Sequence, residues 1–304
     1  MRRAVLLAAL IALPAQAAQD FAYASRVEPG AVIVDSRPLS ACRVKSLPGA
    51  RCLPAEDFLG PHRRLPDARD ILWLLGTAGL GGAEDVLVVG ESAQSRDFLA
   101  GLLYVAGQRS VRVLTEPVGR VLAADAAPGR ERGMTREAVF AAPMRDRLLV
   151  LQNELRAMQP APLLLDGRTD REYWGETVRA QRGGHLPGAV SLPEAPLRAA
   201  PPPVLPQGEA VAYAHDPFEG FAYFTRLRAG HGVAAKIYAE GWAEWAADAR
   251  LPADAVSHPE RARPAEEKSQ PPQDGDLSKR VLPALAMALA AFALGWWGAR
   301  RRAA

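Results

Sequence analysis

Residues 162–168 read Pro-Leu-Leu-Leu-Asp-Gly-Arg, and residues 184–193 read Gly-His-Leu-Pro-Gly-Ala-Val-Ser-Leu-Pro. The first stretch is typical of a short apolar strand that ends in Asp-x-Arg, and the second of a Pro-Gly turn leading into another strand. The same order occurs earlier in the chain, with Ala-Val-Ile-Val-Asp-Ser-Arg at 31–37 and Leu-Pro-Gly-Ala at 47–50. The middle of the chain therefore contains one pattern twice.

Each copy continues with two further apolar stretches. The pattern predicts strands at 85–89 and 209–213, each followed by a loop and a helical stretch that ends at a glycine, Gly107 or Gly230. Strands at 111–114 and 235–238 complete the two copies. Strands that alternate with helices predict an α/β fold with mainly parallel sheets flanked by helices.

The motifs of the second copy resemble the rhodanese superfamily, in the tandem form of the thiosulfate and mercaptopyruvate sulfurtransferases. The first copy matches more loosely, because it lacks Gly-His before its turn and Gly-Trp at its end. The resemblance implies two rhodanese-like domains, which we place at 22–130 and 161–252, with a helical connection at 131–160. The motifs that carry it are Leu-Asp-Gly-Arg at 165–168, Arg-Glu-Tyr-Trp-Gly-Glu at 171–176, the turn at 184–193 and Gly-Trp-Ala-Glu-Trp at 241–245.

In that family, the strand that corresponds to 85–89 and 209–213 is followed directly by a cysteine that accepts sulfur as a persulfide. Backbone N–H groups at the start of a helix surround the sulfur, and this setting lowers the pKa of the thiol. Aligning the strands places Gly90 at this position in the first copy and Ala214 in the second. Because neither residue carries a nucleophile, we predict that neither loop forms the persulfide.

The residues of the two loops remain candidates for binding a ligand. Glu219 falls close to the basic position of the family loop and Asp216 adds a second carboxylate, so an anionic donor such as thiosulfate is expected to meet like charge. Ser92 and Ser95 are either anion contacts or N-cap residues. No cluster has the spacing of metal ligands, and we expect no metal and no cofactor. The full candidate set is Ser92, Ser95, Arg96, His215, Asp216, Glu219 and Gly220.

The chain has two cysteines, Cys42 and Cys52, which flank the turn of the first copy and not its loop. In an oxidising compartment such a pair indicates a structural disulfide, with a stabilisation of roughly 2–3 kcal/mol from the short loop that it closes. A redox-active or sulfur-relaying pair is the alternative. The spacing is not Cys-x-x-Cys, and the sequence leaves the choice open.

The two ends of the chain have the composition of targeting segments. Residues 1–17 combine a basic start, an apolar run and Ala-x-Ala, which is typical of a signal peptide. Residues 253–280 predict a disordered linker, and residues 281–298 a transmembrane helix followed by a basic cytoplasmic tail at 299–304. We therefore expect a bacterial inner-membrane protein with a single C-terminal span and soluble domains in the periplasm.

Charge and composition narrow the function. The apolar fraction of 49% is typical of folded domains. The net charge is only +3, and the basic residues are scattered among a similar number of carboxylates, which argues against a nucleic-acid partner. The leading hypothesis is a catalytically inactive binding or scaffold module in sulfur-related envelope metabolism, with an envelope protein as partner. The alternative is an active sulfurtransferase or thiol-redox protein that uses Cys42 or Cys52, so the sequence does not decide whether the chain is an enzyme.

Overall fold

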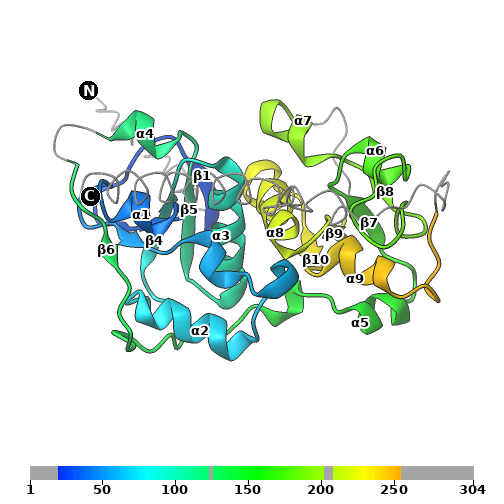
Figure 1. The fold of residues 1–304 in the computed structure, drawn as a ribbon, viewed down its shortest axis with the longest axis horizontal. Helices are drawn as coiled ribbons and strands as arrows, with labels where there is room; N and C mark the ends of the chain where they lie inside the picture. Colours follow the sequence, from blue (N-terminus) through cyan, green and yellow to red (C-terminus); the bar gives the residue numbers. More distant parts are fainter. Residues whose placement is uncertain (1–19, 123–125, 202–207, 255–304) are drawn as a thin grey trace, which may run out of the picture. The chain divides into compact units, whose positions relative to one another are not determined.

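The computed structural model describes residues 20–122, 126–201 and 208–254, and its strands form two sheets (Figure 1). Every neighbouring pair of strands in these sheets is parallel. The first sheet has the order β1 (Phe21–Ala24), β5 (Ser110–Leu114), β4 (Asp85–Val89), β2 (Val32–Asp35), β3 (Arg51–Cys52) and β6 (Arg130–Glu131). The second has the order β10 (Ala235–Ile237), β9 (Ala210–Tyr213), β7 (Leu163–Asp166) and β8 (Val190–Ser191).

The strand order repeats between the sheets, since β5-β4-β2-β3 in the first corresponds to β10-β9-β7-β8 in the second. Seven of these eight strands overlap a stretch that the sequence pattern assigns to a strand or to a turn leading into one, and β3 directly follows the turn at 47–50. The prediction of an α/β fold with parallel sheets and flanking helices is confirmed. The edge strands β1 and β6 were not predicted from the pattern.

Helices connect the strands and pack on the sheets (Figure 1). They are α1 (Leu39–Cys42), α2 (Ala68–Thr77), α3 (Ala93–Ala106), α4 (Val118–Val121), α5 (Gln152–Ala157), α6 (Asp170–Tyr173), α7 (Glu194–Ala199), α8 (Pro217–Thr225) and α9 (Gly241–Ala247). Short 3₁₀ turns lie at Ala55–Phe58, Pro61–Arg63 and Asp146–Leu148, and α8 continues into a π turn at Arg226–Gly230. Helix α3 ends at Gly107, whose left-handed φ of 113° favours glycine.

The two halves of the pattern meet where α3 packs against α8. A Cβ atom on Gly101 of α3 would lie 2.8 Å from the carbonyl oxygen of Phe221, so the absence of a side chain permits this close approach. Phe98 of α3 packs its ring against Phe218 and Phe221 of α8. The largest apolar cluster consequently takes residues from both sheets, and the halves share a core.

The connection at 131–160 differs from the helix that we expected. It contains one 3₁₀ turn and the six-residue helix α5, and the rest of it is not helical. Its backbone instead binds the first half, because Ala138 N donates to Gly76 O at 3.2 Å and Ala141 N donates to Gly81 O at 3.0 Å. Hydrogen bonds to the end of α2 and to the loop after it thus replace the hydrogen bonds within a helix.

The predicted signal peptide at 1–17, transmembrane helix at 281–298 and basic tail at 299–304 lie outside the described residues, as does most of the linker at 253–280. Among the residues that the structure describes, no helix is both long and apolar enough to span a membrane.

Candidate functional site

The second loop begins at Ala214, directly after β9, and is short because α8 starts at Pro217. Asp216 caps this helix by accepting a hydrogen bond of 3.0 Å from Glu219 N. The other side of the loop is held by α9, since Trp242 N donates to Ala214 O and Ala243 N to His215 O, both at 2.9 Å. Ala214 is fixed at the junction of a strand and two helices.

A cavity of about 230 Å³ opens at this loop, and Ala214 and Glu219 are among the residues that line it. Its wall draws on both halves of the chain, with Gln94 coming from α3. Asp216, His215 and Gly220 do not line it. The complete lining is Gln94, Gly167, Arg168, Thr169, Glu172, Arg179, Pro193, Glu194, Ala195, Ala214 and Glu219.

Arg179 neutralises the carboxylate that was expected to repel an anion. Its Nη1 and Nη2 donate to the two oxygens of Glu219 at 2.6 and 2.8 Å, and its Nε donates to Glu172 Oε1 at 2.6 Å. Burial favours the neutral acid, but this guanidinium outweighs it and lowers the pKa of Glu219. A residue 40 positions away thus supplies a counter-charge to Glu219 that the sequence did not indicate.

Asp216 is also paired, in this case with the first half of the chain. The Nε of Arg63 lies 2.7 Å from Asp216 Oδ2, and its guanidinium lies 4.5 Å from the ring centroid of Phe218. Arg63 and His62 both have a left-handed φ of 58°, which is uncommon for residues other than glycine. The second carboxylate of the loop thus contributes no free negative charge either.

His215 is half-buried, and its Nδ1 has no hydrogen-bond partner among the described residues. Burial lowers the pKa of this imidazole, and the nearby charge of Arg179 lowers it further. Its neutral form is favoured for both reasons. No group of three or more His, Cys, Asp or Glu side chains that could hold a metal occurs in the described part of the chain.

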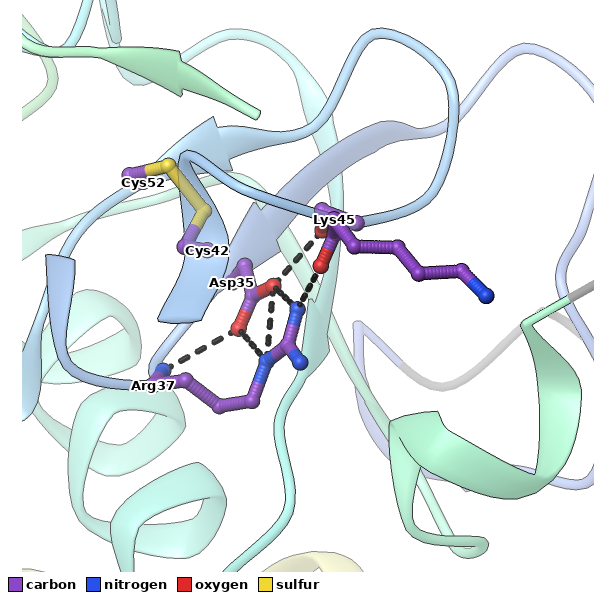
Figure 2. The surroundings of a disulfide bond; sticks show 6 residues. Asp35, Arg37, Cys42, Lys45 and Cys52 are labelled. Atoms are coloured by element: carbon purple, nitrogen blue, oxygen red, sulfur yellow. Dashed lines mark hydrogen bonds and ion pairs between the residues drawn. A yellow bond between two sulfur atoms is a disulfide. The ribbon is translucent and has the colours of Figure 1, made fainter. Parts of the chain in front are cut away.

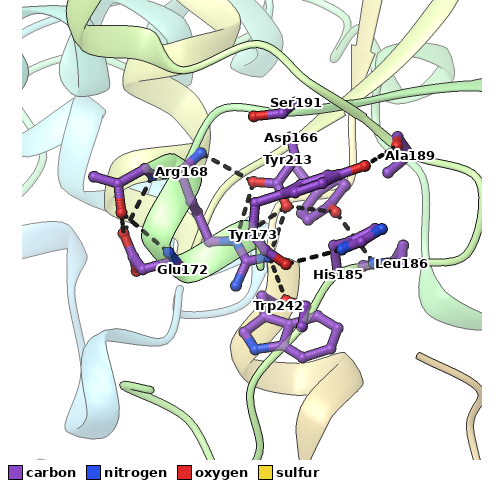
Figure 3. Close-up of polar contacts among 12 residues, drawn as sticks. Asp166, Arg168, Glu172, Tyr173, His185, Leu186, Ala189, Ser191, Tyr213 and Trp242 are labelled. Atoms are coloured by element: carbon purple, nitrogen blue, oxygen red, sulfur yellow. Dashed lines mark hydrogen bonds and ion pairs between the residues drawn. The ribbon is translucent and has the colours of Figure 1, made fainter. Parts of the chain in front are cut away.

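Beneath the cavity, Asp166 organises a buried network (Figure 3). Its carboxylate accepts from Arg168 Nε and Nη2, and Tyr213 Oη donates to it at 2.6 Å. Arg168 Nη2 also donates to Gly184 O, and the guanidinium lies over the ring of Trp242 at 4.8 Å. These contacts fix the Asp-x-Arg motif and the turn at 184–193 against β9, which gives the motif a structural role.

The first loop is closed. Gly90 follows β4, and a Cβ atom there would lie 2.2 Å from Ser36 Oγ. The buried side chain of Arg96 folds onto the loop and donates to Gly90 O at 2.7 Å, Glu91 O at 3.1 Å and Thr115 O at 3.0 Å.

The serines of this loop serve the helix that follows. Ser92 is the N-cap of α3 and accepts a hydrogen bond of 3.3 Å from the backbone N–H of Ser95, which lies in the first turn. This hydrogen bond gives a partner to one of the N–H groups in the first turn of α3, which have no acceptor within the helix. The neighbouring Gln94 is the residue of this turn that reaches the cavity of the second loop.

Cys42 and Cys52 form a disulfide that joins α1 to β3 (Figure 2). Their Cα atoms are 5.8 Å apart, and both residues are fully buried. Gly129 packs directly on the sulfurs, since a Cβ atom there would lie 2.5 Å from Cys42 Sγ. Neither sulfur lines the cavity at Ala214.

Comparison with known proteins shows which family this part of the chain resembles. Residues 151–248 match the family model described as a rhodanese-like domain. The match indicates a rhodanese-like domain in this part of the chain. It contains β7 to β10, the loop at Ala214 and most of the residues that line the cavity.

Solved structures support the same fold over more of the chain. A probable thiosulfate sulfurtransferase is 28% identical with a TM-score of 0.57, and the match covers 75% of this chain and 99% of that one. YnjE is 16% identical with a TM-score of 0.60, and the match covers 77% of this chain and 64% of that one. An EanB variant bound to ergothioneine is 19% identical with a TM-score of 0.59, covering 74% of this chain and 64% of the other. A comparison with curated proteins found no significant match.

Several residues of the site carry no sequence signal. Arg179 lies in no motif, and Glu194 and Gln94 look like ordinary surface residues in the sequence. Glu172 belongs to the motif at 171–176, but nothing in the sequence indicates its bond to Arg179. A capping box of Thr169 and Glu172 was readable as Thr-x-x-Glu and would have located the start of α6.

Proposed function

We propose that this chain is a pair of rhodanese-like domains that transfers no sulfur at either loop and binds a small molecule at the Ala214 loop. In this proposal it acts as a binding or scaffold module in sulfur-related envelope metabolism. The observation that supports the proposal is the cavity at Ala214, a residue with no nucleophile. The charged groups Glu219 and Asp216 of this loop are paired with Arg179 and Arg63.

The first loop supports the same view. Gly90 has no room for any side chain because Ser36 Oγ stands at the Cβ position, and Arg96 fills the loop. A cysteine could not be accommodated there without a shift of Ser36. The ligand is therefore assigned to the second loop alone.

The alternative function, a sulfurtransferase or thiol-redox protein that uses Cys42 or Cys52, needs an accessible thiol. Both cysteines are buried in one disulfide, and the described residues include no free cysteine. Burial in apolar surroundings does not favour a reactive thiolate. We therefore favour the binding function.

The location of the protein belongs to the proposal as well. The signal at 1–17 and the span at 281–298 would hold the folded part on the periplasmic side of the inner membrane, with an envelope protein as partner. Protease treatment of spheroplasts that carry the chain with a C-terminal tag should degrade the folded part and leave the tag protected. A tag that is degraded as well would contradict this topology.

The catalytic part of the proposal is tested with the full chain, thiosulfate and cyanide. The expected result is no thiocyanate above the uncatalysed rate. Turnover by the unmodified chain would overturn the proposal, and its loss in Cys42→Ala or Cys52→Ala would establish the alternative. As the matched control, a sulfurtransferase with its cysteine intact is assayed in the same buffer.

A further inference from the structure

The Ala214 cavity has one carboxylate whose oxygens are not fully used. Glu172 binds Arg179 through Oε1 and Thr169 through Oε2, and Glu219 gives both oxygens to Arg179. Glu194 pairs through Oε1 with Arg198 Nη2 at 2.5 Å, whereas its Oε2 has no ion pair or hydrogen bond within the described part of the chain. Glu194 Oε2 is thus the acceptor that the lining carboxylates leave open.

The two guanidinium groups that line the cavity are already paired with carboxylates. Arg179 uses Nε, Nη1 and Nη2 on two carboxylates. Arg168, which is 4% exposed, is held by Asp166 and Gly184 O and lies over Trp242. An anion that entered the cavity would have to compete with these carboxylates for its counter-charge.

The charge of Glu194 is only partly compensated. Burial raises the pKa of this carboxyl group, and the nearby Arg198 opposes that shift. A further cation beside Glu194 would therefore stabilise its ionised form.

We infer that this cavity selects a small cationic ligand, an amine or a guanidine, which binds Glu194 Oε2. The inference rests on the proposed binding function and specifies its ligand class. With a volume of about 230 Å³, the cavity holds a ligand of a few carbon atoms beyond the cationic group. The negative donors of active sulfurtransferases would be rejected.

The test uses three probes of equal length and different charge, namely butylammonium, butyramide and butyrate, titrated into the full chain and followed by isothermal calorimetry. Butylammonium is expected to bind most tightly, and Glu194→Gln is expected to weaken it by about tenfold, the usual worth of a charge-assisted hydrogen bond. Glu56→Gln, at an exposed carboxylate that does not line the cavity, is the matched control and should leave binding unchanged.

Each outcome decides a different statement. Tighter binding of butyrate, or unchanged butylammonium affinity in Glu194→Gln, overturns the ligand class but leaves a binding function at this loop. Ala214→Leu should abolish binding of all three probes by filling the cavity. If the probes bind equally well to Ala214→Leu, or if none binds to the unmodified chain, both the inference and the site are overturned. Butyramide binding to Glu194→Gln verifies that this variant retains the cavity.

Discussion

Asp97, on α3 in the first half of the chain, accepts a hydrogen bond of 2.8 Å from Arg226, at the end of α8 in the second half. The same carboxylate oxygen accepts from Arg198 at 3.0 Å, and the other oxygen accepts from Tyr23 Oη at 2.7 Å. Asp97 is 1% exposed, so its charge depends on these partners. The cluster joins the two halves beside the wall that carries Glu194, which also pairs with Arg198.

Asp97→Ala should destabilise the whole chain. Removing one member of a buried ion pair leaves its partners uncompensated and typically costs about 3 kcal/mol. Urea unfolding followed by tryptophan fluorescence should show an earlier single transition, since the halves share a core. The control is Asp85→Ala, at an exposed pair with Arg109, for which we expect almost no change. Equal stability of the two variants would contradict the structural role of the cluster.

Gly90→Ala should also destabilise the fold, because the new methyl group would meet Ser36 Oγ at 2.2 Å. Overpacking of this kind costs about 1–3 kcal/mol. Ser36→Ala in the same chain removes the clashing oxygen and should restore part of the loss in a double-mutant cycle. If the changes in unfolding free energy caused by Gly90→Ala and Ser36→Ala are additive, contact between the new methyl group and Ser36 Oγ is not the cause of the destabilisation.

Removal of the disulfide by the double substitution Cys42→Ser and Cys52→Ser should reduce the free energy of unfolding by about 2–3 kcal/mol, as expected for closure of a short loop. Probe binding at the Ala214 cavity should not change, since neither sulfur lines it. A parallel loss of probe affinity at a temperature where the variant is folded would indicate that the disulfide supports the cavity.

A cysteine introduced at Ala214 should be a poor nucleophile. The loop pairs Arg179 with Glu219, so no free cation stabilises a thiolate there. Glu219→Gln in the Ala214→Cys chain removes that competitor, and Arg179 should then raise the alkylation rate by iodoacetamide at pH 7 on the order of tenfold through a lower thiol pKa. Glu56→Gln added to Ala214→Cys is the control, and equal rates in the two double variants would count against this account.

His215 should make the fold sensitive to mild acid. Its pKa is lowered in the folded state from the usual 6.5 by burial and by Arg179. The folded state therefore binds the proton more weakly than the unfolded state, so stability is present above pH 6.5 and is lost as the pH falls below it. The melting temperature should fall less between pH 7.5 and 5.5 in His215→Asn than in the unmodified chain. His62→Asn, at an exposed histidine, serves as the comparison and should retain the full decrease.

The residue pattern was enough to predict the fold class and the two residues, Gly90 and Ala214, that begin the loops. Both follow from local information: apolar runs of strand length, turns built on Pro-Gly and Asp-x-Arg, and a helix end at Gly107 can be recognised without knowing any distant neighbour. The helical expectation for 131–160 failed because tertiary hydrogen bonds to Gly76 and Gly81 outweighed a weak local pattern.

The charge of the site depends on contacts between residues that are distant in the sequence. Glu219 and Asp216 predict a repelling loop when they are considered alone, but Arg179 and Arg63 neutralise them from remote parts of the chain. An ion pair forms only where folding brings both groups within a few ångströms, and no sequence spacing encodes such a meeting. For the same reason, the closure of the first loop by Arg96 and the open oxygen of Glu194 became visible only in three dimensions.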